Sequence, residues 1–269
     1  MGTLFSMDFR KRSSRQMVLV ESVVVFLLLA TVSTYGQQSQ AGVPQTHVQQ
    51  LLITGQNYFD KGRFDDALRV YSQVIALALK DPKAGAIANL RIGSIYLAQR
   101  KTDNAVVSFQ RAITLTPDMA EAHNYLGEAL GELKQYTRAI QSFSRAVALD
   151  PQLLRARYNM GVTYARMGNS KYSEFVFRAL IRNSPGYSLG YDGLAVTLSR
   201  SGRAKEAIPL HEKAISLEPN EPSYYYNLGL SYLMLGNTEK ALEQQEKLRM
   251  IDTRVADQLA SVIIKRQLG

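Results

Sequence analysis

The sequence contains no cysteine, no tryptophan and only three histidines. The absence of cysteine excludes disulfide bonds, thiolate metal ligands, a cysteine nucleophile and acylation on sulfur. The histidines, His47, His123 and His211, offer little imidazole chemistry, and no set of His, Asp and Glu residues has metal-ligand spacing. No strand pattern precedes a phosphate-binding glycine-rich loop. We therefore expect no enzyme, no metal site and no cofactor.

The composition is that of a folded chain rather than a disordered tail or a polytopic membrane protein. Of the 269 residues, 46% are hydrophobic and 20% are charged. Lysine and arginine number 32 against 23 aspartates and glutamates, so the net charge is +9. An excess of this size permits an anionic partner but does not identify one.

Residues 1–36 have the pattern of an export signal. Basic residues at Arg10, Lys11, Arg12 and Arg15 precede the apolar run from Met17 to Val32, which Glu21 interrupts. The uninterrupted part is shorter than the ~20 residues that cross a bilayer, and small residues follow it. We predict a cleaved signal peptide, and hence a periplasmic or secreted protein. The alternative is an uncleaved membrane anchor over residues 17–35.

Residues 37–47 are rich in glutamine and carry no charged side chain, which predicts a flexible linker. From Val48 onward, the sequence repeats with a period of 34 residues. Proline recurs at Pro117, Pro151, Pro185 and Pro219, small residues at Gly93, Gly127, Gly161, Ala195 and Gly229, and aromatic residues at Phe109, Phe143 and Phe177. A sustained period of this length predicts a stack of identical helical units.

These residues resemble the tetratricopeptide repeat family. The unit from Ala120, for example, has Leu126-Gly127 at positions 7 and 8, Ala139 at 20, Phe143 at 24, Ala146 at 27 and Pro151 at 32. Six units match, over residues 48–85, 86–119, 120–153, 154–187, 188–221 and 222–255. The resemblance implies an all-α fold, a right-handed α-solenoid of about six helix-turn-helix units. An amphipathic segment, residues 256–269, is expected to cap its last unit.

Several local features follow from this pattern. We expect position 8 of the first helix to touch position 20 of the second, and His123 and His211 to fill interior packing positions. Gly62, Gly168, Gly202 and Gly236 fall at position 15, where the turn between helices favours a positive φ. The first unit is four residues longer than the others, and we expect the extra residues to add one helical turn before Pro82.

In the family, the first helix of each unit lines a concave groove that binds ligands. Mapping its positions onto this chain implies a ligand groove formed by Phe59, Glu121, Asn124, Glu128, Glu132, Arg155, Tyr158, Arg166, Arg200 and Tyr226. The alternative is that these residues pack between neighbouring helices or are simply solvated. Most of the excess of positive charge lies in the unit 154–187, where six basic residues accompany only Glu174, and Arg155 and Arg166 are the two expected to face the groove.

The predicted function is that of an exported interaction module or assembly scaffold. It would bind a peptide or helix of an envelope or secreted protein in the groove, with charge setting the register. Binding of an anionic glycan or cell-wall polymer by the same arginines is one alternative, and self-assembly by end-to-end stacking is another. Nucleic acid is not expected, because acidic residues alternate with the basic ones.

Overall fold

The structure is a computed structural model that describes residues 47–77 and 81–268. These residues form thirteen helices and no strand, so the predicted all-α fold is confirmed. The first helices of the units, here called A helices, are α2 (His47–Asp60), α4 (Pro82–Ala98), α6 (Ala120–Glu132), α8 (Leu154–Arg166), α10 (Ser188–Arg200) and α12 (Pro222–Met234). The second, or B, helices are α3 (Phe64–Leu77), α5 (Thr102–Leu115), α7 (Tyr136–Leu149), α9 (Ser170–Asn183), α11 (Ala204–Leu217) and α13 (Thr238–Ile251), followed by α14 (Thr253–Leu268). The predicted export signal lies outside the described residues, as does the predicted linker up to Thr46.

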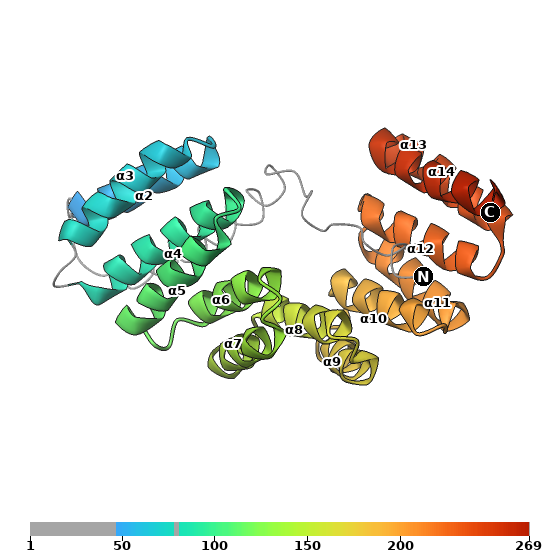
Figure 1. Cartoon of the computed structure of the whole chain (residues 1–269), viewed down its shortest axis with the longest axis horizontal. Coiled ribbons are helices and arrows are strands. Elements are labelled where there is room, and N and C mark those ends of the chain that lie inside the picture. Colours follow the sequence, from blue (N-terminus) through green and yellow to red (C-terminus); the bar gives the residue numbers. More distant parts are fainter. Residues whose placement is uncertain (1–46, 78–80, 269) are drawn as a thin grey trace, which may run out of the picture. The chain divides into compact units, whose positions relative to one another are not determined.

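The chain divides into two compact units, residues 1–95 and 96–269. In the first, α2 and α3 form an antiparallel pair. In the second, A and B helices pair in sequence, α6 with α7, α8 with α9, α10 with α11 and α12 with α13 (Figure 1). Each B helix in this part also packs against the next A helix, so every interior helix of the second unit has partners on both sides.

The glycines at position 8 allow the two helices of a pair to approach closely. A Cβ atom added to Gly127 would lie 2.6 Å from the ring of Phe143, and one added to Gly161 would lie 2.8 Å from the ring of Phe177. Both rings belong to position 24, so the nearest neighbour is this aromatic residue rather than the small residue expected at position 20. The reason is that the ring reaches across the helix pair, whereas the side chain at position 20, Ala139 or Ser173, is short.

The turns between paired helices adopt the left-handed backbone conformation at position 15. Gly62, Gly168, Gly202 and Gly236 have φ values of 69°, 79°, 79° and 75°, which confirms the prediction for these glycines. The equivalent residues of the other two units are Arg100 and Lys134, with φ values of 61° and 59°. These two side chains occupy a conformation that costs ~1–2 kcal/mol per residue for an L-amino acid.

The four extra residues of the first unit lie after Pro82, not before it as predicted. Helix α4 begins at Pro82 and has 17 residues, whereas α6, α8, α10 and α12 have 13 each. The Asp81 carboxylate accepts a hydrogen bond from the backbone N–H of Ala84 at 3.0 Å. Asp81 therefore caps the helix and Pro82 occupies its first position, where proline is tolerated because no hydrogen bond is required of its nitrogen.

The last helix, α14, covers the end of the second compact unit. It packs against both α12 and α13, and its residues Val255, Ala256, Leu259 and Ile263 are buried. A Cβ atom added to Gly229 of α12 would lie 2.7 Å from the side chain of Leu259. Helix α14 thus takes the place that a further unit would occupy, as expected for a cap.

Candidate functional site

A polar cluster joins the A helices α6 and α8. Its centre is Glu128, whose Oε1 accepts hydrogen bonds from Asn124 Nδ2 at 2.8 Å and Asn159 Nδ2 at 2.7 Å. Asn159 also donates to Asn124 Oδ1 at 3.2 Å. Asn124 is fully buried, whereas the Glu128 side chain is 30% exposed. The two amides, one buried and one partly exposed, thus hold a partly exposed carboxylate in one position.

Arg155 of α8 completes this cluster. Its Nε lies 3.6 Å from Glu128 Oε1, and its guanidinium lies over the ring of Tyr125, 4.8 Å from the centroid. The Arg155 side chain is 39% exposed. The Tyr125 ring in turn stacks on Phe109 of α5 with centroids 5.6 Å apart. The guanidinium is therefore oriented by a carboxylate on one side and an aromatic ring on the other.

A related cluster joins α10, α11 and α12 but is buried. Asp192 Oδ1 lies 2.7 Å from Nδ1 of His211, and Asn227 Nδ2 donates to both Asp192 oxygens at 3.2 and 3.0 Å. All three side chains are buried. Asn227 and Asn159 occupy the same position of two units that are two repeats apart, and each bonds an acidic side chain of the preceding A helix. These asparagines therefore tie A helices together, and Asn227 is buried away from any ligand.

The predicted groove residues divide into three groups in the structure. Glu132, Arg166 and Arg200 are exposed, and Glu121, Glu128, Arg155 and Tyr158 are partly exposed. Phe59, Asn124 and Tyr226 are buried, so they pack between helices and present little surface to a partner. Phe59 belongs to the compact unit 1–95, where its ring lies 5.7 Å from that of Phe64. The other nine belong to the unit 96–269.

The structure brings together Asn124, Glu128 and Arg155, and it adds Asn159 and Tyr125, which were not among the predicted site residues. The sequence feature that could have indicated Asn159 is its place four residues, about one helical turn, after Arg155. Both residues lie on α8, the A helix that follows the acidic helix α6. Tyr158 lies against Phe177, with ring centroids 5.8 Å apart. His211 is buried as predicted, whereas His123 is only half-buried and its Nε2 lies 3.0 Å from the Pro117 carbonyl oxygen.

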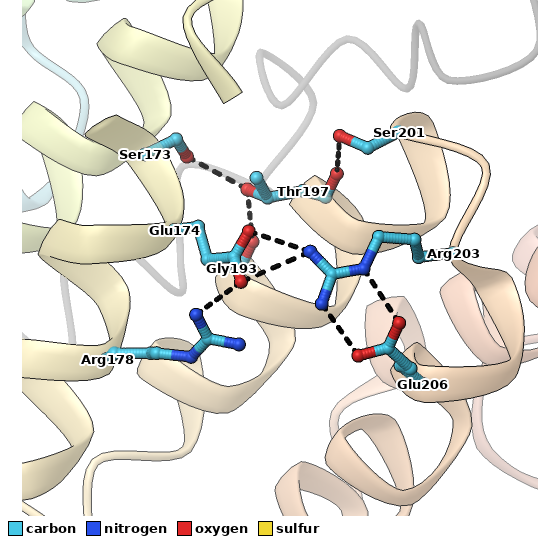
Figure 2. A network of polar contacts seen from close by, with 8 residues as sticks. All are labelled: Ser173, Glu174, Arg178, Gly193, Thr197, Ser201, Arg203 and Glu206. Atoms are coloured by element: carbon cyan, nitrogen blue, oxygen red, sulfur yellow. Dashed lines mark hydrogen bonds and ion pairs between the residues drawn. The ribbon is translucent and has the colours of Figure 1, made fainter. Parts of the chain in front are cut away.

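A second polar network lies among α9, α10 and α11 (Figure 2). Arg203 bonds both oxygens of Glu174, at 3.2 and 2.9 Å, and both oxygens of Glu206, each at 2.7 Å. Glu174 also pairs with Arg178. The hydrogen bond from Arg203 lowers the pKa of Glu206, and the same bond is the largest cause of a raised pKa of Arg203. The network ties neighbouring B helices together at the surface.

Within residues 47–77 and 81–268, no group of three or more His, Asp or Glu side chains is arranged to hold a metal ion. None of the helices that the structure describes combines the length and apolarity needed to cross a bilayer.

Three solved structures illustrate the similarity of this fold to known helical proteins. PilW, described as a widely conserved type IV pilus biogenesis factor, is 22% identical, covers 82% of this chain and all of its own, and superposes with a TM-score of 0.70. A tetratricopeptide repeat protein from Parabacteroides merdae is 19% identical over 93% of this chain and 99% of its own, with a TM-score of 0.66. The MamA protein is 25% identical over 66% of this chain and 94% of its own, with a TM-score of 0.54.

Sequence comparison identifies the repeats themselves. No curated protein sequence matches the chain significantly. Three family models, each described as a tetratricopeptide repeat, match residues 54–117 and 90–153, residues 191–223, and residues 212–243. These matches together span more than half of the sequence and follow the helix pairs seen in the structure. The chain therefore belongs to the tetratricopeptide repeat family.

Proposed function

We propose that this protein is an exported scaffold that binds a segment of a partner protein along the A helices α6, α8 and α10. Tetratricopeptide repeats generally serve as interaction modules rather than as enzymes. The observation that carries the proposal is the Glu128–Arg155 pair, because the amides of Asn124 and Asn159 hold this half-exposed pair at a defined position on the A helices. Side chains fixed before binding lose less conformational entropy when a partner arrives.

The pair offers both a hydrogen-bond acceptor and a donor to a partner. Oε1 of Glu128 contacts Asn124, Asn159 and Arg155, and the side chain is still 30% exposed, so the carboxylate can also accept a hydrogen bond from a partner. The Arg155 guanidinium, steadied over Tyr125, can donate to a partner carboxylate. Together they favour a segment in which a basic or amide side chain neighbours an acidic one.

The other charged side chains near the pair repeat its arrangement, with acidic residues on α6 and basic residues on the A helices that follow. Glu121 and Glu132 lie on α6, whereas Arg166 lies on α8 and Arg200 on α10. A partner segment would therefore place its basic part over α6 and its acidic part over α8 and α10. Each exposed charge pair contributes only ~0.2–1 kcal/mol, so the charges determine the register and association rate more than the affinity.

The test is in-cell photocrosslinking from the A-helix face, followed by mass spectrometry. A photoreactive residue at Arg166, exposed at the end of α8, should crosslink to a partner protein, whereas the same residue at Arg145 on the B helix α7 serves as the matched control. Affinity for the crosslinked segment is then measured with Arg155→Glu and Arg166→Glu. We expect at least a tenfold loss for the double variant, and weaker binding of the wild type as salt rises.

Three outcomes would contradict the proposal. Equal crosslinking from Arg145 and Arg166 would mean that the A helices do not select the partner. Recovery of a polysaccharide would favour glycan binding instead, and recovery of the same chain alone would favour self-assembly. Export is tested separately by determining the amino terminus of the mature protein, which we expect at Gln37, after removal of residues 1–36.

A further inference from the structure

The outward face of the B helix α9 carries basic and aromatic side chains together. Lys171, Phe175, Arg178 and Arg182 follow one another at intervals of four, three and four residues, so they lie along one stripe of the helix. Phe175 is 68% exposed and Tyr172, beside the stripe, is 55% exposed. The Tyr172 ring stacks on Tyr164 of α8, with centroids 5.4 Å apart, and is thereby held at the surface. We call these five residues the α9 face.

The α9 face is positive because the acidic residues near it are already paired with arginine. Glu206 of α11, whose carboxylate is close enough to Arg178 to feel its charge, bonds Arg203. Glu174, the only acidic residue of α9, binds Arg178 and also Arg203 from the start of α11 (Figure 2). Lys171 and Arg182 form no ion pair with any part of the chain that the structure describes. The preceding B helix, α7, contains two arginines and no acid, so it adds to the positive potential. Lys171, Arg178 and Arg182 are the basic residues of the unit 154–187 that do not lie on its A helix, α8.

The composition of this face indicates what it binds. One largely exposed phenylalanine with one tyrosine is too small an apolar patch for a stable protein interface, which buries about 800 Å² on each partner. Aromatic side chains flanked by lysine and arginine are instead typical of helices that lie in the interface of an anionic bilayer. Such a surface needs no complementary pocket, and the α9 face belongs to a single outward helix.

We propose that the α9 face binds the surface of an anionic lipid bilayer. Lys171, Arg178 and Arg182 would contact headgroup phosphates, and the Phe175 ring would insert among the upper parts of the acyl chains. This surface lies on a B helix, so membrane contact and partner binding along the A helices are independent properties of the protein. The proposal concerns α9 alone and does not depend on whether residues 1–36 are removed.

The absence of tryptophan from the sequence makes a local test possible in the full chain. In a Phe175→Trp variant, the introduced indole is the only one in the protein, so its fluorescence reports the α9 face alone. Vesicles of phosphatidylglycerol and phosphatidylcholine in equal parts should shift its emission to shorter wavelength, and brominated acyl chains should quench it. Vesicles of phosphatidylcholine alone should do neither. Met250→Trp on α13, at a residue that is 89% exposed, is the matched control and should show no shift.

The charges are tested in the same background. Adding Lys171→Gln, Arg178→Gln and Arg182→Gln should raise the lipid concentration that gives the half-maximal shift about a hundredfold. The reason is that each basic residue near an anionic surface makes a similar favourable contribution to membrane binding. High salt should have a similar effect. Circular dichroism confirms that each variant is folded, and Glu174 keeps Arg203 as a partner when Arg178 is replaced.

Several results would overturn the proposal. One is the absence of a shift with anionic vesicles, and another is an equal shift with zwitterionic vesicles. A shift that survives the triple glutamine substitution, or one of equal size in Met250→Trp, would show that the apolar leader or some other surface brings the protein to lipid. A shift on addition of a polyglutamate peptide, without one on vesicles, would assign the α9 face to an acidic protein partner instead.

Discussion

Replacement of His211 by phenylalanine should destabilise the protein, although phenylalanine is the residue found at the same position of three other units. In those units, Phe109, Phe143 and Phe177 are buried, just as His211 is. His211 differs because its Nδ1 lies 2.7 Å from Asp192 Oδ1 in the buried cluster. The His211→Phe variant would leave the Asp192 carboxyl group buried, with Asn227 as its only remaining partner in this cluster.

The magnitude follows from burial. Removing one partner from a buried polar group costs ~1–3 kcal/mol, and more when the group is charged. Part of this loss is offset, because His211 Nε2 is buried and has no hydrogen-bond partner among the described residues. We therefore expect a net loss of about 2 kcal/mol in the free energy of unfolding for His211→Phe.

A second substitution tests whether the loss comes from the Asp192 contact. The chain already contains an arrangement without histidine, in which Asn124 of α6 accepts from Asn159 of α8 at 3.2 Å while Phe143 fills the position of His211. The double variant Asp192→Asn, His211→Phe copies that arrangement between α10 and α12. We expect it to recover at least 1 kcal/mol relative to His211→Phe, which corresponds to a coupling energy typical of residues in contact.

The assay is urea unfolding followed by circular dichroism for the wild type, both single variants and the double variant. Comparison of the midpoints at constant m-value gives the coupling energy. If His211→Phe is as stable as the wild type, the hydrogen bond to Asp192 does not contribute to stability. If the effects of the two single substitutions simply add in the double variant, the two residues are not coupled and the reasoning is refuted.

Three further predictions concern single positions. Arg100→Gly and Lys134→Gly should each raise the free energy of unfolding by ~0.5–1 kcal/mol in urea titrations, because glycine avoids the steric cost of a positive φ and this gain outweighs its larger loss of conformational entropy; a loss of stability would contradict the assigned turns. Gly161→Ala should lower the free energy of unfolding by about 1–2 kcal/mol, because the added methyl group would overlap the Phe177 ring. An unchanged midpoint of urea unfolding would refute that contact. Burial raises the pKa of Tyr226, so the folded state keeps this phenol protonated while the unfolded chain ionises above pH ~10. Stability should therefore fall as pH rises beyond that value, and Tyr226→Phe should fall less steeply; equal slopes would show that Tyr226 does not titrate differently in the two states.

The helix pairs could be predicted from the sequence because their determinants are local. Glycine at position 8 and an aromatic ring at position 24, as in Gly127 and Phe143, meet within one unit of 34 residues. The extra turn of α4 also had a local signal, since the Asp81-Pro82 pair is a typical cap followed by a first helical residue. The predicted turn was placed on the wrong side of Pro82 because the period alone fixes the number of extra residues and not their position.

The candidate site was predicted less completely because exposure depends on the neighbouring unit. Position 5 of the A helix holds Asn124, Tyr158 and Asp192 in successive units, yet only Tyr158 is partly exposed. Asn124 and Asp192 are buried because Asn159 and Asn227, 35 residues later, bond to them across the interface. The family pattern gives each of these residues a position but not its partner.

The sequence by itself determined the period, the all-α class, the helix pairs and the unit that carries most of the excess positive charge, because each depends on residue type and spacing within about one repeat. Only the tertiary structure decided which of the charges are exposed and which are neutralised. Glu128 holds Arg155 on the A helices, Glu174 is neutralised by Arg178 and Arg203, and Lys171 stays unpaired among the described residues. The physical reason is that an ion pair or a buried amide depends on the distance between side chains of different helices, which no spacing within one helix specifies.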